Sequence, residues 1–129
     1  MSLAQKIKVL IVDDQVTSRL LLGEALQSLG FSQITVAGDG QQGLAIMQQQ
    51  PHHLVISDFN MPKLDGLGLL RAMRQHAPTQ KMPFIMLTGK GDKELIQKGV
   101  QFGMNNYLTK PFTVPALQSA LEAVVGRLK

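Results

Sequence analysis

Short runs of hydrophobic residues alternate along the chain with longer segments in which apolar residues recur at helical spacing. The short runs predict strands at residues 9–12, 33–37, 54–57, 84–87 and 106–109. The longer segments predict helices at residues 15–29, 40–50, 66–76, 92–102 and 113–128. In the last of these, Leu117, Leu121 and Val124 form one apolar stripe, and Thr113 is placed to cap the helix. The pattern therefore predicts five strands, each followed by a helix.

Several predicted strands are apolar at consecutive positions, as in Val9-Leu10-Ile11-Val12. Strands of this kind are buried on both faces, which is typical of a parallel sheet between two layers of helices. The run at 33–37 is more polar and is predicted to lie at an edge of the sheet. Since no repeat or linker interrupts the pattern, residues 1–129 are expected to form a single α/β domain.

Composition excludes several classes of protein. Hydrophobic residues make up 44% of the chain and charged residues 17%, so a folded protein is expected, and the absence of cysteine excludes disulfides and thiolate metal sites. The net charge of +4 is spread along the chain and aromatic residues are only 5%, which argues against direct nucleic-acid binding. No apolar stretch approaches the roughly 20 residues of a membrane span. We expect a monomeric cytoplasmic protein with no membrane partner.

Chemically active residues follow four of the predicted strands. Asp13 and Asp14 follow the first strand, Asp58 the third, Thr88 the fourth and Lys110 the fifth. Because the carboxyl ends of parallel strands share one edge of the sheet, these side chains are expected to converge there. Individually each has an ordinary explanation, such as an aspartate that caps the following helix. Their joint position at one edge favours a functional site.

Three carboxylates at one edge require a cation or added protons, since two of them about 5 Å apart repel by roughly 3 kcal/mol at an effective dielectric near 20. With oxygen ligands alone, the expected ion is Mg²⁺, with Mn²⁺ as an alternative. The histidines are not expected to take part. His52 and His53 precede the third strand, roughly 16–20 Å from its far end, and His76 lies at the end of a predicted helix.

Four motifs resemble those of the response-regulator receiver domains of two-component signalling. They are VLIVDD at 9–14, SDFNMP at 57–62, LTG at 87–89 and YLTKPF at 107–112. The resemblance spans nearly the whole chain and is strongest to the stand-alone chemotaxis regulators. It implies a flavodoxin-like (βα)5 doubly wound parallel sheet of five strands in the order 2-1-3-4-5. It also implies a signalling protein that catalyses only its own phosphorylation and dephosphorylation.

The resemblance assigns a role to each residue of the expected site. Asp58 matches the acceptor of a phosphoryl group from the phosphohistidine of a sensor histidine kinase. The matched Mg²⁺ ligands are Asp13, Asp14, Asp58 and the backbone carbonyl of Asn60. Lys110 and Thr88 match the groups that hold the phosphoryl oxygens. Such an arrangement suits phosphoryl transfer, in which positioning and charge neutralisation supply most of the catalysis.

The resemblance further implies a conformational switch. Thr88 matches the hydroxyl that moves toward the phosphoryl group, and Tyr107 matches the aromatic residue that rotates inward behind it. The implied output face consists of the fourth predicted helix, the fifth strand and the fifth helix, including Lys93 and Phe112. Its target would be a protein, with the flagellar motor switch as one candidate. Lys90 departs from the usual acidic residue, and we hypothesise that it changes the lifetime of the phosphorylated form.

Three alternatives stay open at this point. The chain could be the receiver of a longer regulator with a separate effector domain. A phosphatase with an aspartyl-phosphate intermediate of the haloacid-dehalogenase type would need an acid two residues after Asp58, where Asn60 stands. A flavodoxin-like cofactor binder would need a phosphate-binding loop after the first strand, where Asp13 and Asp14 would repel a phosphate.

Overall fold

A five-stranded parallel sheet runs through the centre of the molecule in the computed structural model, which describes residues 3–89 and 92–126. The strands are β1 (Lys8–Val12), β2 (Gln33–Ala37), β3 (Leu54–Asp58), β4 (Phe84–Thr88) and β5 (Asn106–Thr109). Their order, β2-β1-β3-β4-β5, confirms the flavodoxin-like topology. The more polar β2 lies at an edge of this sheet, as its sequence predicted.

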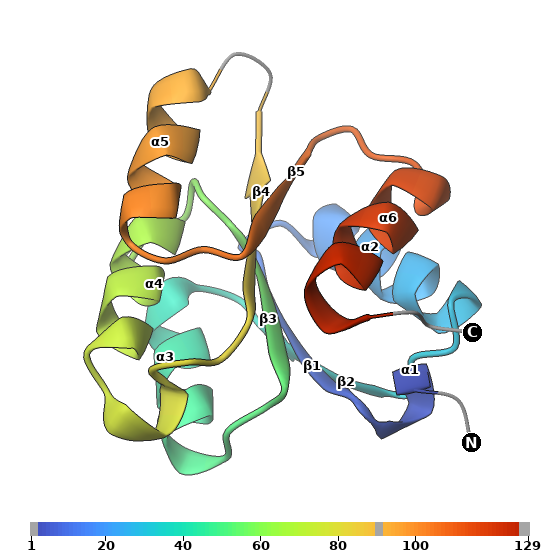
Figure 1. Ribbon diagram of the computed structural model, residues 1–129, viewed down its shortest axis with the longest axis horizontal. Coiled ribbons are helices and arrows are strands. Elements are labelled where there is room, and N and C mark those ends of the chain that lie inside the picture. Colours follow the sequence, from blue (N-terminus) through green and yellow to red (C-terminus); the bar gives the residue numbers. More distant parts are fainter. Residues whose placement is uncertain (1–2, 90–91, 127–129) are drawn as a thin grey trace.

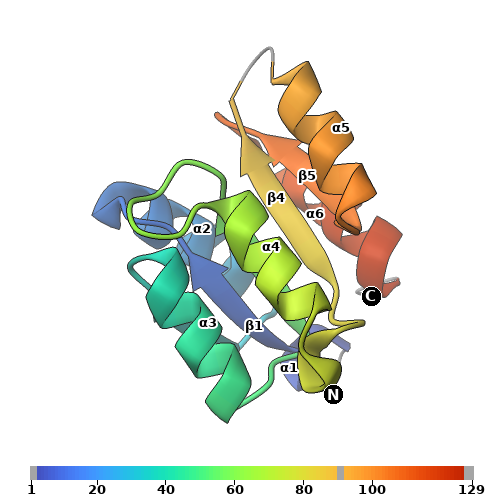
Figure 2. The same ribbon diagram turned by 90° about the vertical axis from the view of Figure 1, so that its left-hand side faces the viewer.

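Helices cover both faces of the sheet (Figure 1). They are α1 (Leu3–Lys6), α2 (Val16–Ser28), α3 (Gly40–Gln49), α4 (Gly66–Arg74), α5 (Lys93–Gln101) and α6 (Val114–Val125), with a short 3₁₀ helix η1 (Ala77–Thr79). On one face lie α2 and α6, and on the other α3, α4 and α5 lie in front of the sheet (Figure 2). None of the helices in the described part of the chain is long and apolar enough to cross a membrane.

The interior strand β1 supplies side chains to two separate hydrophobic cores. Val9 and Ile11 belong to the core beneath α2 and α6, whereas Leu10 and Val12 belong to the core beneath α3 and α4. All four are fully buried. This alternation follows from the two-residue period of a strand, and it explains why the run is apolar at every position.

Most element boundaries agree with the sequence pattern, with three differences. The short helix α1 was not predicted, because four residues are too few to show a helical period. The helix predicted at 66–76 ends at Arg74, and η1 follows, with the Thr79 hydroxyl donating to the carbonyl of Met73 at 2.8 Å. The last helix is capped by Thr113, as predicted, and ends at Val125, while residues 127 and 128 of the predicted range lie outside the described part.

Candidate functional site

The strand ends bring three carboxylates together at one edge of the sheet. Asp13, Asp14 and Asp58, called the acidic cluster below, each place one carboxylate oxygen within 4.8 Å of the others. Asp13 is buried, Asp58 is half-buried and Asp14 is exposed, so the cluster leads from the interior to the solvent. The parallel register produces this convergence, because Val12, at the end of β1, pairs with Ser57, the neighbour of Asp58.

Asp13 is the most firmly held member of the cluster. One of its carboxylate oxygens accepts a hydrogen bond from the backbone N–H of Gln15 at 3.0 Å, and the other accepts one from Lys110 Nζ at 3.0 Å. Arg19 donates to its backbone carbonyl at 2.7 Å. The N-cap of α2 is Gln15, without a side-chain cap bond, so neither Asp13 nor Asp14 is the residue that caps this helix. The helix-capping alternative for these aspartates is therefore wrong.

Asp58 is the last residue of β3 and lies between its cationic and anionic neighbours. Its Oδ1 accepts a hydrogen bond from the N–H of Phe59 at 3.0 Å and forms an ion pair with Lys110 Nζ at 3.5 Å. Burial raises the pKa of the Asp58 carboxyl above its ordinary value of 3.8; Lys110 partly opposes this effect, and Asp13 adds to it. Because ionisation of the Asp58 carboxyl is costly in this setting, a further bound cation would stabilise its ionised form.

Lys110 brings the positive charge to the cluster. It follows β5, whose pairing with β4 ends in the hydrogen bond from the Lys110 N–H to the Thr88 carbonyl at 2.7 Å. Its Nζ also donates to Ser18 Oγ at 3.0 Å. Sequence reasoning missed Ser18, although a hydroxyl in the first turn of the helix after Asp13 and Asp14 was an available signal. The Lys110–Pro111 peptide bond is cis.

Thr88 ends β4 with its side chain directed into the protein. The residue is 2% exposed, and among the described residues its Oγ1 finds no hydrogen-bond partner. A buried hydroxyl without a partner costs about 1–3 kcal/mol, so this atom is suited to receive an oxygen that arrives later. Tyr107, on the neighbouring strand β5, is 42% exposed. Asn60 is exposed in the loop two residues after Asp58.

The other predicted positions lie away from the cluster or outside the described residues. His52, at the opposite end of β3, is buried, and its ring nitrogens contact the Gln50 carbonyl at 2.7 Å and Thr35 Oγ1 at 2.9 Å. These contacts explain why a histidine is buried at this position without a role in the site. Lys90, for which we hypothesised an effect on the phosphorylated form, lies outside the described residues.

The chemistry of the site fits a hard divalent cation. Its donor atoms are carboxylate oxygens, which Mg²⁺ prefers, and three of them lie close enough together to reach one ion. Two of the three carboxylates share the Lys110 ammonium, which leaves their combined charge incompletely neutralised. The residues present therefore suit Mg²⁺, and Asp14 offers the most accessible ligand.

Comparison with known proteins places this geometry in a family. The family model for the response regulator receiver domain matches residues 9–122 of the chain. The chain is 64% identical over 129 residues to the probable chemotaxis protein CheY of Rhizobium etli, covering the whole of both chains. It is 34% identical over 126 residues to chemotaxis protein CheY-3 of Vibrio cholerae, covering 98% of this chain and 97% of that protein. The chain therefore belongs to the response regulator receiver family.

Solved structures agree with this assignment. The chemotaxis protein CheY4 of Vibrio cholerae, crystallised at low pH, is similar with a TM-score of 0.85 and 34% identity, over 92% of this chain and 98% of that one. The receiver domain of a sensor histidine kinase from Pseudomonas aeruginosa gives a TM-score of 0.84 and 30% identity, over 93% and 98% of the two chains. That domain carries a magnesium ion coordinated in its active-site cleft.

Proposed function

We propose that the chain is a single receiver domain that works as a phosphorylation-activated signalling switch, with Asp58 as the phosphoryl acceptor. The observation that carries this proposal is the position of Asp58 among its neighbours. Its carboxylate is 3.5 Å from the Lys110 ammonium and within 4.8 Å of the oxygens of Asp13 and Asp14, yet its side chain is still 13% exposed. A nucleophile in this position is reachable from solvent and is surrounded by groups that can neutralise an incoming phosphoryl charge.

In the proposed reaction an oxygen of the Asp58 carboxylate forms a bond to the phosphorus of a phosphohistidine on a sensor histidine kinase. The phosphorus–nitrogen bond breaks at the same time, and the imidazole leaves with the electron pair. Lys110 holds one phosphoryl oxygen, and the Thr88 hydroxyl, which has no hydrogen-bond partner among the described residues, donates to another. Mg²⁺, or Mn²⁺ in its place, would be held by Asp13, Asp14, Asp58 and the Asn60 backbone carbonyl, and it would neutralise charge on the transferred group.

The switch would work through the hydroxyl of Thr88 and the ring of Tyr107. A phosphoryl oxygen near Thr88 offers its buried hydroxyl a partner that it lacks among the described residues, which favours movement of that hydroxyl toward the phosphoryl group. The exposed Tyr107 ring can then turn inward. The face that changes would comprise α5, β5 and α6 and would include Lys93 and Phe112.

The biological setting is proposed from the relatives. The chain covers the whole of a 64% identical protein named as a probable chemotaxis protein, which favours chemotaxis. A cytoplasmic location and a protein target such as the flagellar motor switch are what the resemblance to the chemotaxis regulators implies. The chain also matches part of longer proteins, covering 49% of a two-component response regulator with a GGDEF domain at 31% identity. The receiver of a longer regulator is therefore the second candidate. In either case the domain catalyses only its own phosphorylation and dephosphorylation.

Intact-mass spectrometry after incubation with Mg²⁺ and acetyl phosphate tests the proposed acceptor. We expect one phosphoryl adduct that requires the metal ion and is absent from Asp58→Asn. Circular dichroism of the variant would show that its fold is intact. An adduct that persists in Asp58→Asn would place the acceptor elsewhere, and no adduct with any metal ion or donor would refute the proposal.

A further inference from the structure

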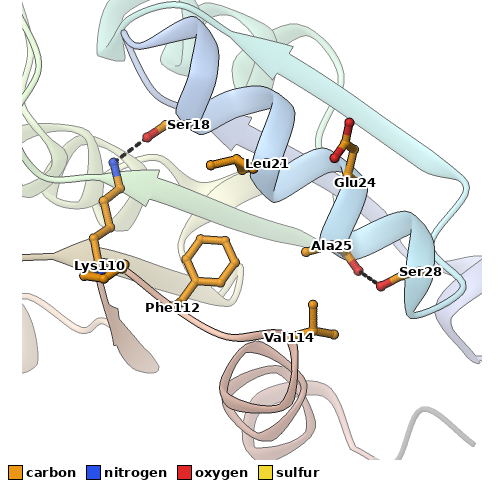
Figure 3. A pocket seen from close by; sticks show the side chains of 9 residues that line it. Ser18, Leu21, Glu24, Ala25, Ser28, Lys110, Phe112 and Val114 are labelled. Atoms are coloured by element: carbon orange, nitrogen blue, oxygen red, sulfur yellow. Dashed lines mark hydrogen bonds between the residues drawn. The ribbon is translucent and has the colours of Figure 1, made fainter.

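A cavity of about 600 Å³ lies between α2 and the segment that leads from β5 into α6. Most of its wall is apolar, and the Phe112 ring lies between the two helices (Figure 3). The Ser18 hydroxyl and the Lys110 ammonium meet at one end of the cavity, and Ser28 lies at the far end of α2 (Figure 3). Lys110 therefore lies between the cavity and the acidic cluster and contacts both.

The Lys110 ammonium is held from three directions. Its two short contacts, both 3.0 Å, are to Asp13 Oδ2 and Ser18 Oγ, and its contact to Asp58 Oδ1 is longer at 3.5 Å. An ammonium group has three hydrogens to donate, so the three acceptors match its capacity. Ser18 supplies the one uncharged acceptor, on the side of the ammonium that faces α2 and the cavity.

We propose that Ser18 is a positioning residue for phosphoryl transfer, which fixes the Lys110 ammonium beside Asp58 before the phosphoryl group arrives. This inference rests on the proposed function, because it concerns the acceptor site. Within the part of the chain that the structure describes, the Ser18 hydroxyl accepts from Lys110 Nζ, and no hydrogen bond joins it to Asp58 or to the other members of the acidic cluster. Its effect is therefore exerted through Lys110.

The location of Ser18 makes it a suitable anchor. It lies in the first turn of α2, and the same helix is fixed to the core by Leu22 and Leu26, which are 1% and 0% exposed. Lysine, in contrast, has a flexible four-carbon side chain, and that of Lys110 is 27% exposed. Without the serine hydroxyl, water would take its place, and the ammonium would be held only by Asp13 and Asp58, with more freedom to shift from the position that faces Asp58.

A preorganised cation stabilises developing charge without having to be reoriented during the reaction. Loss of one hydrogen bond to a half-exposed ammonium is expected to slow phosphorylation about five-fold. The effect should fall on the rate of the phosphoryl-transfer step rather than on the apparent affinity for the donor. Ser18→Thr keeps the hydroxyl and should restore the rate, which a change in helix stability alone would not predict.

The experiment compares Ser18→Ala and Ser18→Thr with a matched control, Ser28→Ala. Ser28 also lies on α2 and lines the same cavity, but its hydroxyl donates to the Ala25 carbonyl at 2.7 Å and not to Lys110. Phosphorylation by acetyl phosphate with Mg²⁺ is measured over a range of donor concentrations. Hydrogen exchange of the Lys110 ammonium is measured by ¹⁵N NMR without metal or donor, with the signal assigned by its loss in Lys110→Arg.

We expect slower phosphorylation and faster ammonium exchange in Ser18→Ala, with Ser18→Thr and Ser28→Ala close to the parent. Equal rates and equal exchange in Ser18→Ala and the parent would overturn the inference, as would a slow Ser18→Thr with an intact fold. If even the parent is not phosphorylated, the proposed function fails instead. The NMR comparison would then still decide whether Ser18 holds Lys110.

Discussion

Replacing Asp58 by asparagine should stabilise the fold at neutral pH in the absence of Mg²⁺. The attraction of the Asp58 carboxylate to Lys110 and its repulsion by Asp13 nearly cancel, and the exposed Asp14 carboxylate adds a further repulsion that solvent screens. At an effective dielectric near 20, attraction to Lys110 at 3.5 Å contributes about 5 kcal/mol, and repulsion by Asp13 within 4.8 Å costs about 3.5 kcal/mol or more. Desolvation of a buried ion costs several kcal/mol, and here it is reduced because 13% of the side chain is exposed.

The cost of desolvation therefore decides whether the substitution raises or lowers the stability, in agreement with the raised pKa of Asp58, for which burial is the largest cause. We expect Asp58→Asn to raise the free energy of unfolding by about 1 kcal/mol, or the melting temperature by about 3–5 °C. The gain should depend on pH. Because the folded carboxyl binds its proton more tightly than the unfolded one, the stability of the parent falls as the pH rises from 3.8 through the raised folded-state pKa.

The assay is urea denaturation in EDTA at several pH values between about pH 3 and pH 7, with Glu24→Gln as the control. Glu24 is an exposed acidic residue of α2, so loss of its charge should change the stability by less than about 0.5 kcal/mol. The advantage of Asp58→Asn should be absent below pH 3.8 and complete above the folded-state pKa of Asp58. The reasoning would be refuted if Asp58→Asn were less stable than the parent at neutral pH. It would also be refuted if the gain in stability did not change with pH.

Three further predictions concern the metal ion, the buried hydroxyl and the packing behind Asp58. Mg²⁺ at a hundred times its dissociation constant should stabilise the parent by about 2.7 kcal/mol and Asp58→Asn by much less, as measured by thermal denaturation. Thr88→Val removes a buried hydroxyl that lacks a partner in the described structure, so urea denaturation should show unchanged or higher stability, by up to about 1 kcal/mol, while phosphorylation slows. Gly66→Ala should destabilise the fold by about 1–3 kcal/mol in urea denaturation, because its Cβ would lie 2.6 Å from the Asp58 carbonyl oxygen. The control is Gly23→Ala, whose Cβ would lie in open space on α2 and which should stabilise the fold by about 1 kcal/mol.

The order of elements and the edge of the sheet that carries the site could be predicted from sequence for a local reason. A strand or helix imposes its period on the residues that it contains, so Val9-Leu10-Ile11-Val12 indicates a strand buried on both faces without knowledge of its neighbours. The cap of α6 at Thr113 is equally local, since its side chain accepts from the N–H of Ala116 three residues later. Parallel topology then fixes where every strand ends, which is why Asp13 and Asp58 were expected together.

Only the tertiary structure decided which side chains touch within the site. Lys110 contacts Ser18 across 92 residues and Asp13 across 97, and both contacts depend on the strand register and on the rotation of α2 about its axis. The periodicity of residues within one strand or helix does not determine the strand register or the rotation of α2. The same holds for the raised pKa of Asp58, which arises chiefly from burial, and for the Thr88 hydroxyl, which has no hydrogen-bond partner among the described residues. Burial and contact are sums over neighbours from distant parts of the chain. The sequence alone therefore indicated which strand-end residues share one edge of the sheet, and packing determined their distances, the contact of Lys110 with Ser18 and the raised pKa of Asp58.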